Sequence, residues 1–361
     1  MKPPFRADQV GSLLRPAELA RARAKFKKSE IASGELKALE DKCIQRAIQK
    51  QESIGLEAIT DGEFRRDWWH LDFLAQLDGV TAVANPGPKF GGTEEQPPIP
   101  SVTGKVACSK PIMVNDFVYL RQHTRQTAKF TIPSPAMLHL RGGRGAISRQ
   151  AYPDLDEFWA DAAAAWRAAI RHLADAGCRY LQLDDVSFSY LCDPKIQATA
   201  RRNGDDPAKL PRTYANAVTE ALRDRPAGMT VTMHTCRGNF KSSWVASGGY
   251  EPVAEAMFSS AVDAFFMEFD SARAGGFEPL RYLPKDKKVV LGLVTSKSPV
   301  LEAKDFIKKR IDEATRFVPL ANLCLSPQCG FSSTHHGNSL TEDEQWRKLE
   351  RVVEVAREVW R

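Results

Sequence analysis

The hydrophobic and polar positions of this chain follow two alternating periods. Residues 154–176 are rich in alanine and carry apolar side chains at helical spacing, which predicts a helix that ends at Gly177. Residues 179–183 (RYLQL) follow and predict a buried strand that stops at Asp184-Asp185. A helix followed by a short buried strand is therefore the unit to look for elsewhere in the chain.

Comparable apolar runs that stop on polar residues recur along the whole sequence. The polar stops fall at residues 9–12, 61–63, 133–135, 184–185, 234–236, 268–270, 295–297 and 327–329. Eight strands that alternate with helices predict an α/β protein with a (β/α)8 TIM-type barrel. The chemistry of such barrels lies at the carboxyl ends of the strands, which is where these polar residues collect.

Two segments fit the repeating unit less well. Residues 76–126 contain a Pro/Gly-rich stretch and then alternating positions, which predicts a hairpin excursion over the barrel mouth. Residues 1–60 predict an N-terminal strand and a helical extension that flanks the barrel. We expect one catalytic barrel over residues 1–361. A doubly wound sheet is the alternative, but no G-x-G-x-x-G motif follows a predicted strand.

Composition narrows the class of protein further. The chain is 43% hydrophobic and 27% charged, which is typical of a globular protein and excludes wholesale disorder. It has no apolar run of 18 residues and no apolar segment near the start, so we expect a cytoplasmic protein without a membrane partner. The net charge of +6 is spread along the sequence, which argues against nucleic acid. Seven cysteines in such a chain favour metal ligation or burial over disulfides.

The strongest chemical signal is His234-x-Cys236, followed by Glu268 and Cys329 at later strand ends. Alternate residues of a strand point to the same side, so the imidazole and the first thiol can converge. Imidazole and thiolate ligands select zinc over magnesium or calcium. Cys329 as a small buried hydrophobic residue and Glu268 as an ion-pair partner are the structural alternatives.

Six motifs in matching order cover nearly the whole chain: RADQVGSLLRP, DGEFRRDW, LQLDD, TMHTCRGN, FFMEFDSAR and SPQCGF. Together they resemble the catalytic barrel of cobalamin-independent methionine synthase, and most closely its short single-barrel relatives. The resemblance implies a zinc ion held by His234, Cys236, Glu268 and Cys329, which binds homocysteine through sulfur. It also implies that the amino-acid part of homocysteine is held by Gly11, Ser12, Glu63 and Asp184. Asp185 is the alternative to Asp184, because the strand register is open by one residue.

The chain differs from the family in the features that serve the methyl donor. Full-length members carry a second barrel that helps to grip polyglutamyl methylfolate, and we expect only the catalytic barrel here. The family places a histidine as proton donor where this sequence has Lys297, in Thr295-Ser296-Lys297-Ser298-Pro299. A lysine is a poorer proton donor at neutral pH, and it could instead bind an anionic ligand.

These residues predict a zinc-dependent methyltransferase that forms methionine from homocysteine, with Lys297 as a catalytic candidate. The donor is expected to differ from polyglutamyl methylfolate; methylcobalamin, a corrinoid protein or a simpler methylfolate are the candidates. One alternative is an alkyltransferase that acts on another small thiol such as coenzyme M. The other is a non-catalytic barrel that binds zinc or a corrinoid partner.

Overall fold

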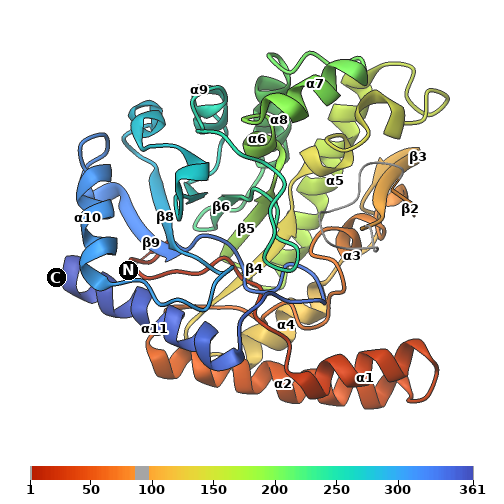
Figure 1. Ribbon diagram of the computed structural model, residues 1–361. Helices are drawn as coiled ribbons and strands as arrows, with labels where there is room; N and C mark the ends of the chain where they lie inside the picture. Colours follow the sequence, from red (N-terminus) through yellow and green to blue (C-terminus); the bar gives the residue numbers. More distant parts are fainter. Residues whose placement is uncertain (1, 86–96, 361) are drawn as a thin grey trace.

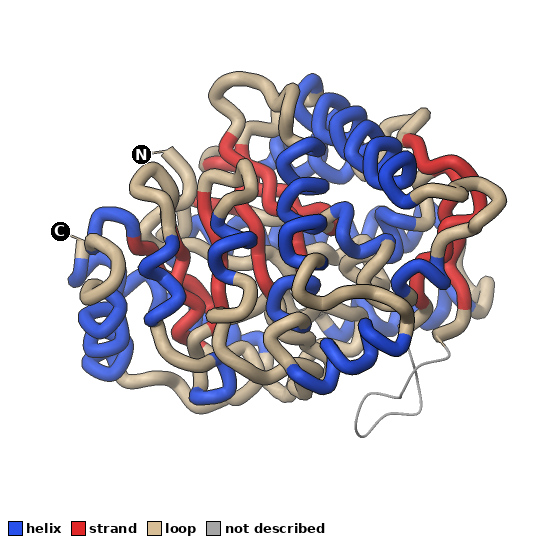
Figure 2. Tube along the Cα trace, turned by 90° about the horizontal axis from the view of Figure 1, so that it is seen from above, coloured by secondary structure: helices blue, strands red, loops and turns tan. Residues whose placement is uncertain are grey.

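A curled parallel sheet forms the centre of the computed structural model, which describes residues 2–85 and 97–360. Within these residues its seven strands follow the spatial order β1-β4-β5-β6-β7-β8-β9 (Figure 1). Their bounds are Ala58–Ile59 (β1), Thr127–Pro133 (β4), Tyr180–Asp185 (β5), Thr230–Thr235 (β6), Ala264–Glu268 (β7), Lys288–Val294 (β8) and Leu323–Pro327 (β9). Helices surround the strands in the view from above (Figure 2). The predicted α/β fold of the TIM-barrel type is confirmed.

Helices connect the strands and flank the sheet. The longer ones are Ala17–Lys27 (α1), Ser33–Ile54 (α2), Val114–His123 (α4), Leu155–Asp175 (α5), Pro194–Arg202 (α7), Leu210–Ala221 (α8), Lys304–Ala314 (α10) and Glu342–Val359 (α11); Leu71–Leu74 (α3), Ser187–Tyr190 (α6) and Ala254–Phe258 (α9) are short. The helix predicted at 154–176 is α5, which begins where the side chain of Asp154 accepts a hydrogen bond from the backbone N–H of Asp156 at 3.0 Å. It ends before Gly177, whose φ of +96° is the left-handed conformation that suits glycine.

The core lies between the sheet and these helices. Every residue of β5, β7 and β9 is buried, because parallel strands with helices outside are covered on both faces. This double burial explains why the strands appear in the sequence as continuous apolar runs rather than as alternating ones.

The predicted N-terminal strand is reduced to a single bridge, which corrects that part of the prediction. Ala7 pairs in parallel with Leu325 of β9, and no regular strand is present at residues 9–12. Buried side chains hold the segment instead: the ammonium of Lys129 lies 3.1 Å from Asp8, and the hydroxyl of Tyr180 donates to Asp8 at 2.8 Å. Polar contacts inside the barrel thus replace part of the backbone ladder that the pattern predicts.

The predicted excursion at 76–126 is a hairpin only in its first part. Asp78–Val83 (β2) pairs antiparallel with Ile99–Ala107 (β3), as expected, and residues 86–96 lie outside the described part of the chain. The hairpin packs beside α5 at the rim (Figure 1), and Pro97 is the one residue of its described part that lines the pocket presented below. The second part is α4, which packs against β4 and α2 and covers the barrel like its other helices.

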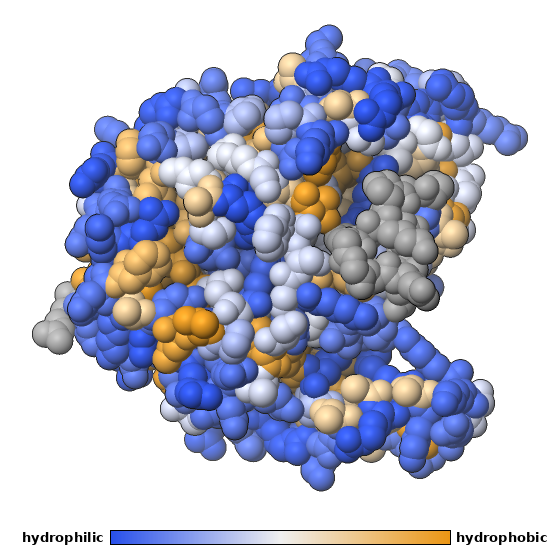
Figure 3. All heavy atoms as spheres, viewed as in Figure 1, coloured by the Kyte–Doolittle hydropathy of each residue, from blue (hydrophilic) through white to orange (hydrophobic). Residues whose placement is uncertain are grey.

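Polar residues dominate the face of the molecule seen in Figure 3, and apolar residues are scattered among them. Among the residues that the structure describes, none of the helices combines the length and the apolar character that a membrane span requires.

Replacing Lys129 by methionine tests the polar closure of the barrel. The variant leaves Asp8 fully buried without its cation, and we expect the free energy of unfolding to fall by about 3–5 kcal/mol, because an uncompensated buried charge is strongly destabilising. Urea unfolding followed by circular dichroism measures this loss. Lys50→Met is the control: its ion pair with Glu350 is solvent-exposed, so its loss is expected to stay below about 1 kcal/mol. A similarly small loss for Lys129→Met would contradict the interpretation.

Candidate functional site

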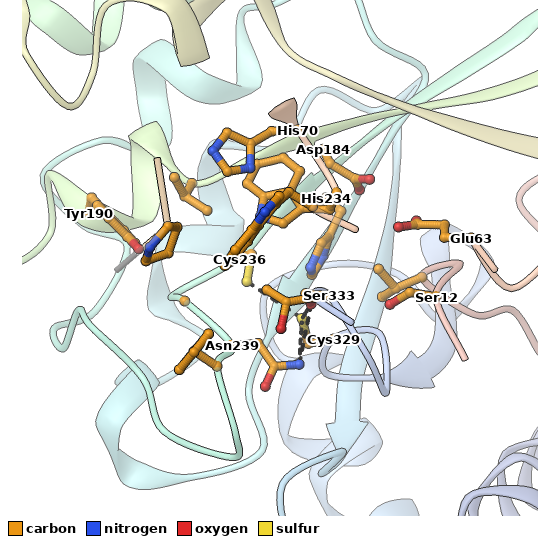
Figure 4. Close-up of a pocket in the computed structure, with 18 of the residues that line it drawn as sticks. Ser12, Glu63, His70, Asp184, Tyr190, His234, Cys236, Asn239, Cys329 and Ser333 are labelled. Carbon is orange, nitrogen blue, oxygen red and sulfur yellow. Dashed lines mark hydrogen bonds between the residues drawn. The ribbon is translucent and has the colours of Figure 1, made fainter. Parts of the chain in front are cut away.

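Strand β6 delivers the first two candidate metal ligands. His234 lies in the strand, in register with Asp184 of β5 and Phe266 of β7, and Cys236 follows its last residue. The backbone N–H of Cys236 donates to the carbonyl oxygen of Asp185 at 2.7 Å, which extends the pairing by one step and fixes the direction of the thiol. Both side chains are buried and line one pocket at the carboxyl ends of the strands (Figure 4).

Glu268 is the last residue of β7 and has no exposed surface. One carboxylate oxygen accepts the backbone N–H of Arg237 at 2.8 Å, and the other accepts a hydrogen bond from the guanidinium of Arg273 at 3.0 Å. Burial raises the pKa of Glu268, and the neighbouring Cys329 adds to the rise. These two hydrogen bonds orient the carboxylate and stabilise its negative charge, which burial makes unfavourable.

Cys329 completes the set, two residues after β9. Its sulfur lies 3.5 Å from the sulfur of Cys236, and the side-chain amide of Asn239 donates to it at 3.6 Å. The contact between the thiols lowers the pKa of Cys329 well below its usual range and raises that of Cys236 well above it, because one proton serves both sulfurs. Both cysteines are free.

The ligand atoms of His234, Cys236, Glu268 and Cys329 all lie within 4.8 Å of one another. Both ring nitrogens of His234 are buried, and neither has a hydrogen-bond partner among the described residues. A buried imidazole beside two thiols and a carboxylate is a donor set that suits a metal cation. Sulfur and nitrogen ligands in a set of four suit a tetrahedral ion of the zinc type.

A buried acidic pair lies at another side of the same pocket. Glu63 follows β1, and its carboxylate accepts a hydrogen bond from Thr131 at 2.9 Å; Asp184 of β5 accepts one from Gln182 at 2.7 Å. Burial raises the pKa of Asp184 to about 7, and Glu63 contributes; burial likewise raises the pKa of Glu63. The second carboxylate oxygen of Glu63 has no hydrogen-bond partner in the described chain, although Arg66 lies 3.8 Å away. The pair is therefore prepared for a cationic group.

The sequence left open whether Asp184 or Asp185 faces the pocket, and the structure places Asp184 there. Asp185 points away from the pocket. Its carboxylate accepts hydrogen bonds from the backbone N–H and the hydroxyl of Ser187, each at 2.6 Å, and from the hydroxyl of Ser134. Asp185 thus organises the turn that begins α6.

Gly11 and Ser12 border the acidic pair, and two glycines allow this close packing. Gly11 has φ of +149°, and a Cβ there would lie 2.9 Å from the Cγ2 of Thr131. At Gly330 a Cβ would come within 2.0 Å of the hydroxyl oxygen of Ser12. Ser12 lines the pocket and Gly11 shapes the turn beneath it.

Lys297 lies near the ligand set but not on the pocket wall. Its ammonium donates to the side-chain carbonyl of Asn239 at 2.9 Å and to the backbone carbonyl of Gly238 at 3.2 Å. Because the amide of Asn239 also contacts Cys329, the lysine is connected to the thiols through this loop.

Further residues line the pocket that the sequence reasoning did not select: His70, Arg141, Tyr190, Asn239 and Ser333. Asn239 belongs to the segment TMHTCRGN, so its motif offered a signal. Arg141 and Tyr190 come from connections beyond the strand ends, where the sequence pattern carries no information about which side chains turn inward.

Residues 5–358 match the family described as cobalamin-independent synthase, catalytic domain. The chain is 46% identical to the protein YxjH of Bacillus subtilis over 364 residues, which cover the whole chain and 96% of YxjH. A solved structure from Listeria monocytogenes, described as a candidate vitamin-B12-independent methionine synthase, has a TM-score of 0.82 and 41% identity and covers 100% of this chain and 99% of its own. The chain belongs to this family of methionine synthase-like methyltransferases.

A more distant relative is the 5-methyltetrahydropteroyltriglutamate–homocysteine methyltransferase of Thermotoga maritima. It is 22% identical over 364 residues, which cover 99% of this chain and only 45% of that enzyme. The chain thus spans less than half the length of that relative, and most of the length of YxjH.

Removing either thiol tests the metal centre. We expect Cys236→Ser and Cys329→Ser each to reduce Zn²⁺ affinity by tenfold or more in equilibrium dialysis, because a thiolate ligand is replaced by a hydroxyl. Cys324→Ala is the control, since Cys324 is buried in the barrel core with Val10, Phe266 and Val290. Full zinc affinity in both ligand variants would remove these cysteines from the set.

Proposed function

We propose that this protein is a zinc-dependent methyltransferase of the cytoplasm that transfers a methyl group to the thiol of homocysteine and forms methionine. The observation that carries the proposal is that one pocket is lined by three members of a soft metal-ligand set, His234, Cys236 and Cys329, and by a buried acidic pair with an unused oxygen. The first suits a sulfur ligand, and the second suits an α-ammonium group. An amino acid with a side-chain thiol offers both groups in one molecule.

The acidic pair fixes the amino-acid end of this acceptor. Glu63 and Asp184 each offer a carboxylate to the ammonium group, which has three N–H donors. Binding of a cation stabilises both carboxylates in their charged forms and so reverses the rise in pKa that burial causes. The hydroxyl of Ser12 is on the same side and serves the α-carboxylate (Figure 4).

The ligand set prepares the sulfur. Zinc held by His234, Cys236, Glu268 and Cys329 supplies a Lewis acid that favours the thiolate of a bound thiol. The backbone N–H of Arg237 and the guanidinium of Arg273 keep Glu268 oriented, and Asn239 donates a hydrogen bond toward Cys329. These contacts hold the ligands in place before the acceptor arrives.

The reaction itself is a nucleophilic displacement. The thiol releases its proton to the solution, and an electron pair of the sulfur forms the new bond to the methyl carbon. The bond between that carbon and the donor breaks, and its electron pair stays on the leaving atom of the donor. Methylcobalamin, a corrinoid protein and monoglutamyl methylfolate remain the candidate donors, and polyglutamyl methylfolate is disfavoured.

Coenzyme M is a poorer acceptor for this pocket. Its sulfonate requires a cation where the amino-acid end of homocysteine would bind, and on that side of the pocket Glu63 and Asp184 offer carboxylates instead. Arg237 could supply the cation for a sulfonate by its charge, but it is completely buried over the ring of Tyr250 and does not line the pocket.

Substitutions of the acidic pair test the acceptor. Glu63→Gln and Asp184→Asn are each expected to raise the KM for homocysteine by about tenfold or more, because a hydrogen bond to a charged group contributes about 1.5–3 kcal/mol. Zinc content should stay unchanged, and Glu30→Gln, an exposed carboxylate, should have no effect. Methionine formation with each candidate donor is the assay.

If no donor yields methionine and homocysteine releases no proton on mixing with the zinc-loaded protein, a non-catalytic zinc or corrinoid-binding barrel is favoured.

Lys297→Met tests the lysine separately. We expect a lower kcat with zinc retained, because the ammonium holds Asn239 against Cys329. Lys309→Met, an exposed lysine of α10, is the control. An unchanged kcat would show that Lys297 is a bystander.

A further inference from the structure

Three polar side chains that the proposed chemistry does not use line the same pocket, and Arg141 lies close enough to His70 and Tyr190 to influence the pKa of both. His70 precedes α3, Arg141 lies in the connection after β4, and Tyr190 ends α6 after β5. They therefore come from the connections after β1, β4 and β5, which are consecutive in the sheet. Figure 4 shows Tyr190 and Glu63 at opposite ends, with His234 and Cys236 between them.

His70 is a buried imidazole without a partner. It is only 1% exposed, and neither ring nitrogen makes a hydrogen bond within the described residues. Its ring lies against that of Trp69, with centroids 4.6 Å apart. Burial lowers the pKa of His70 well below its usual range, and Arg141 adds to this effect, so the ring is neutral and offers one donor and one acceptor. A buried group of this kind needs a ligand.

Arg141 brings a positive charge to the same place. Its Nε is buried and has no hydrogen-bond partner, and the guanidinium forms no ion pair within residues 2–85 and 97–360. Burial raises the pKa of Tyr190, so its hydroxyl stays protonated beside this cation. An arginine beside two neutral hydrogen-bonding groups is suited to a carboxylate or a phosphate, which a guanidinium binds with two parallel hydrogen bonds.

The positive charge of Arg141 is opposite in sign to the carboxylates at the end of the pocket where the acceptor is proposed to bind. Glu63 and Asp184 attract a cation, whereas Arg141 repels one, so the two ends of the pocket select different molecules. The thiol of the acceptor would bind between these two ends, next to the candidate metal ligands. A donor that approaches the thiol from the far end therefore passes Arg141.

We propose that Arg141, His70 and Tyr190 form an anion-binding subsite that holds a carboxylate or phosphate group of the methyl donor. The inference rests on the proposed methyl transfer for the identity of the ligand as donor. It selects anionic donors and disfavours sulfonium compounds without an anionic group, such as trimethylsulfonium, whose positive sulfur would lie near the guanidinium. Trp68 and Trp69 also line the pocket, and their fluorescence reports binding there.

Binding measurements test the subsite without requiring turnover. Tryptophan fluorescence is titrated with monoglutamyl 5-methyltetrahydrofolate as the carboxylate probe, with methylcobalamin as the phosphodiester probe and with trimethylsulfonium as the cationic probe; equilibrium dialysis checks each value. We expect Arg141→Gln to raise the Kd of at least one anionic probe by tenfold or more and to leave that of homocysteine unchanged. The probe that responds identifies whether the group is a carboxylate or a phosphate.

Matched variants separate this effect from a change of fold. Arg149→Gln removes an exposed arginine of the same connection and should leave every Kd unchanged. Arg141→Lys should restore part of the anion affinity, and His70→Asn should bind anionic probes better than His70→Leu, because the amide keeps a donor and an acceptor. A KM increase for the donor at constant KM for homocysteine is the corresponding kinetic result.

The outcomes distinguish the two proposals. If Arg141→Gln weakens anion binding although no donor yields methionine, the subsite stands and the proposed function fails. If methionine forms and the variant leaves the Kd and KM of every donor unchanged, the subsite is overturned. A rise in the Kd of homocysteine instead would assign Arg141 to the acceptor carboxylate and would also overturn it.

Discussion

Electrostatic repulsion at the barrel mouth is the constraint on which the proposed site depends. The thiols of Cys236 and Cys329 and the carboxylate of Glu268 lie within 4.8 Å of one another with almost no access to water. The carboxylate pair of Glu63 and Asp184 lies nearby. Buried charges are unfavourable unless they are paired. Without a cation these groups must share and retain protons, as the raised pKa values of Glu268, Glu63 and Asp184 express. A divalent ion at one cluster and an ammonium group at the other remove both penalties.

The barrel makes this concentration of ligands possible because its strands end at a common edge. Residues of β5, β6, β7 and β9 that are far apart in sequence meet there, and the rigid buried sheet holds them. Closure of the barrel is itself partly polar: Asp8 is held by Lys129 and Tyr180 where a regular strand would have been paired. The position of Ser12, four residues later, depends on that anchoring.

The connections add a second layer above the strand ends. His70, Arg141 and Tyr190 line the pocket from three connections, and Lys297 donates hydrogen bonds to Gly238 and Asn239 beside the candidate ligands. In the two proposals, strand ends would provide the metal and acceptor groups, whereas connections would provide the groups that face the donor. Specificity for the donor would then lie on the part of the fold that varies most easily.

The sequence by itself determined the strand and helix succession, because doubly buried strands require continuous apolar runs and their ends carry polar residues. The motifs around His234, Cys236, Glu268 and Cys329 likewise indicated one ligand set, since side chains at the ends of parallel strands meet at one edge. Tertiary structure alone decided that Asp184 rather than Asp185 faces the pocket, that the N-terminal segment forms one bridge, and that residues 114–123 form a helix of the barrel. It also decided that Arg141 lines the pocket. The orientation of a side chain in a connection depends on packing against distant segments, and no local pattern of the sequence encodes that packing.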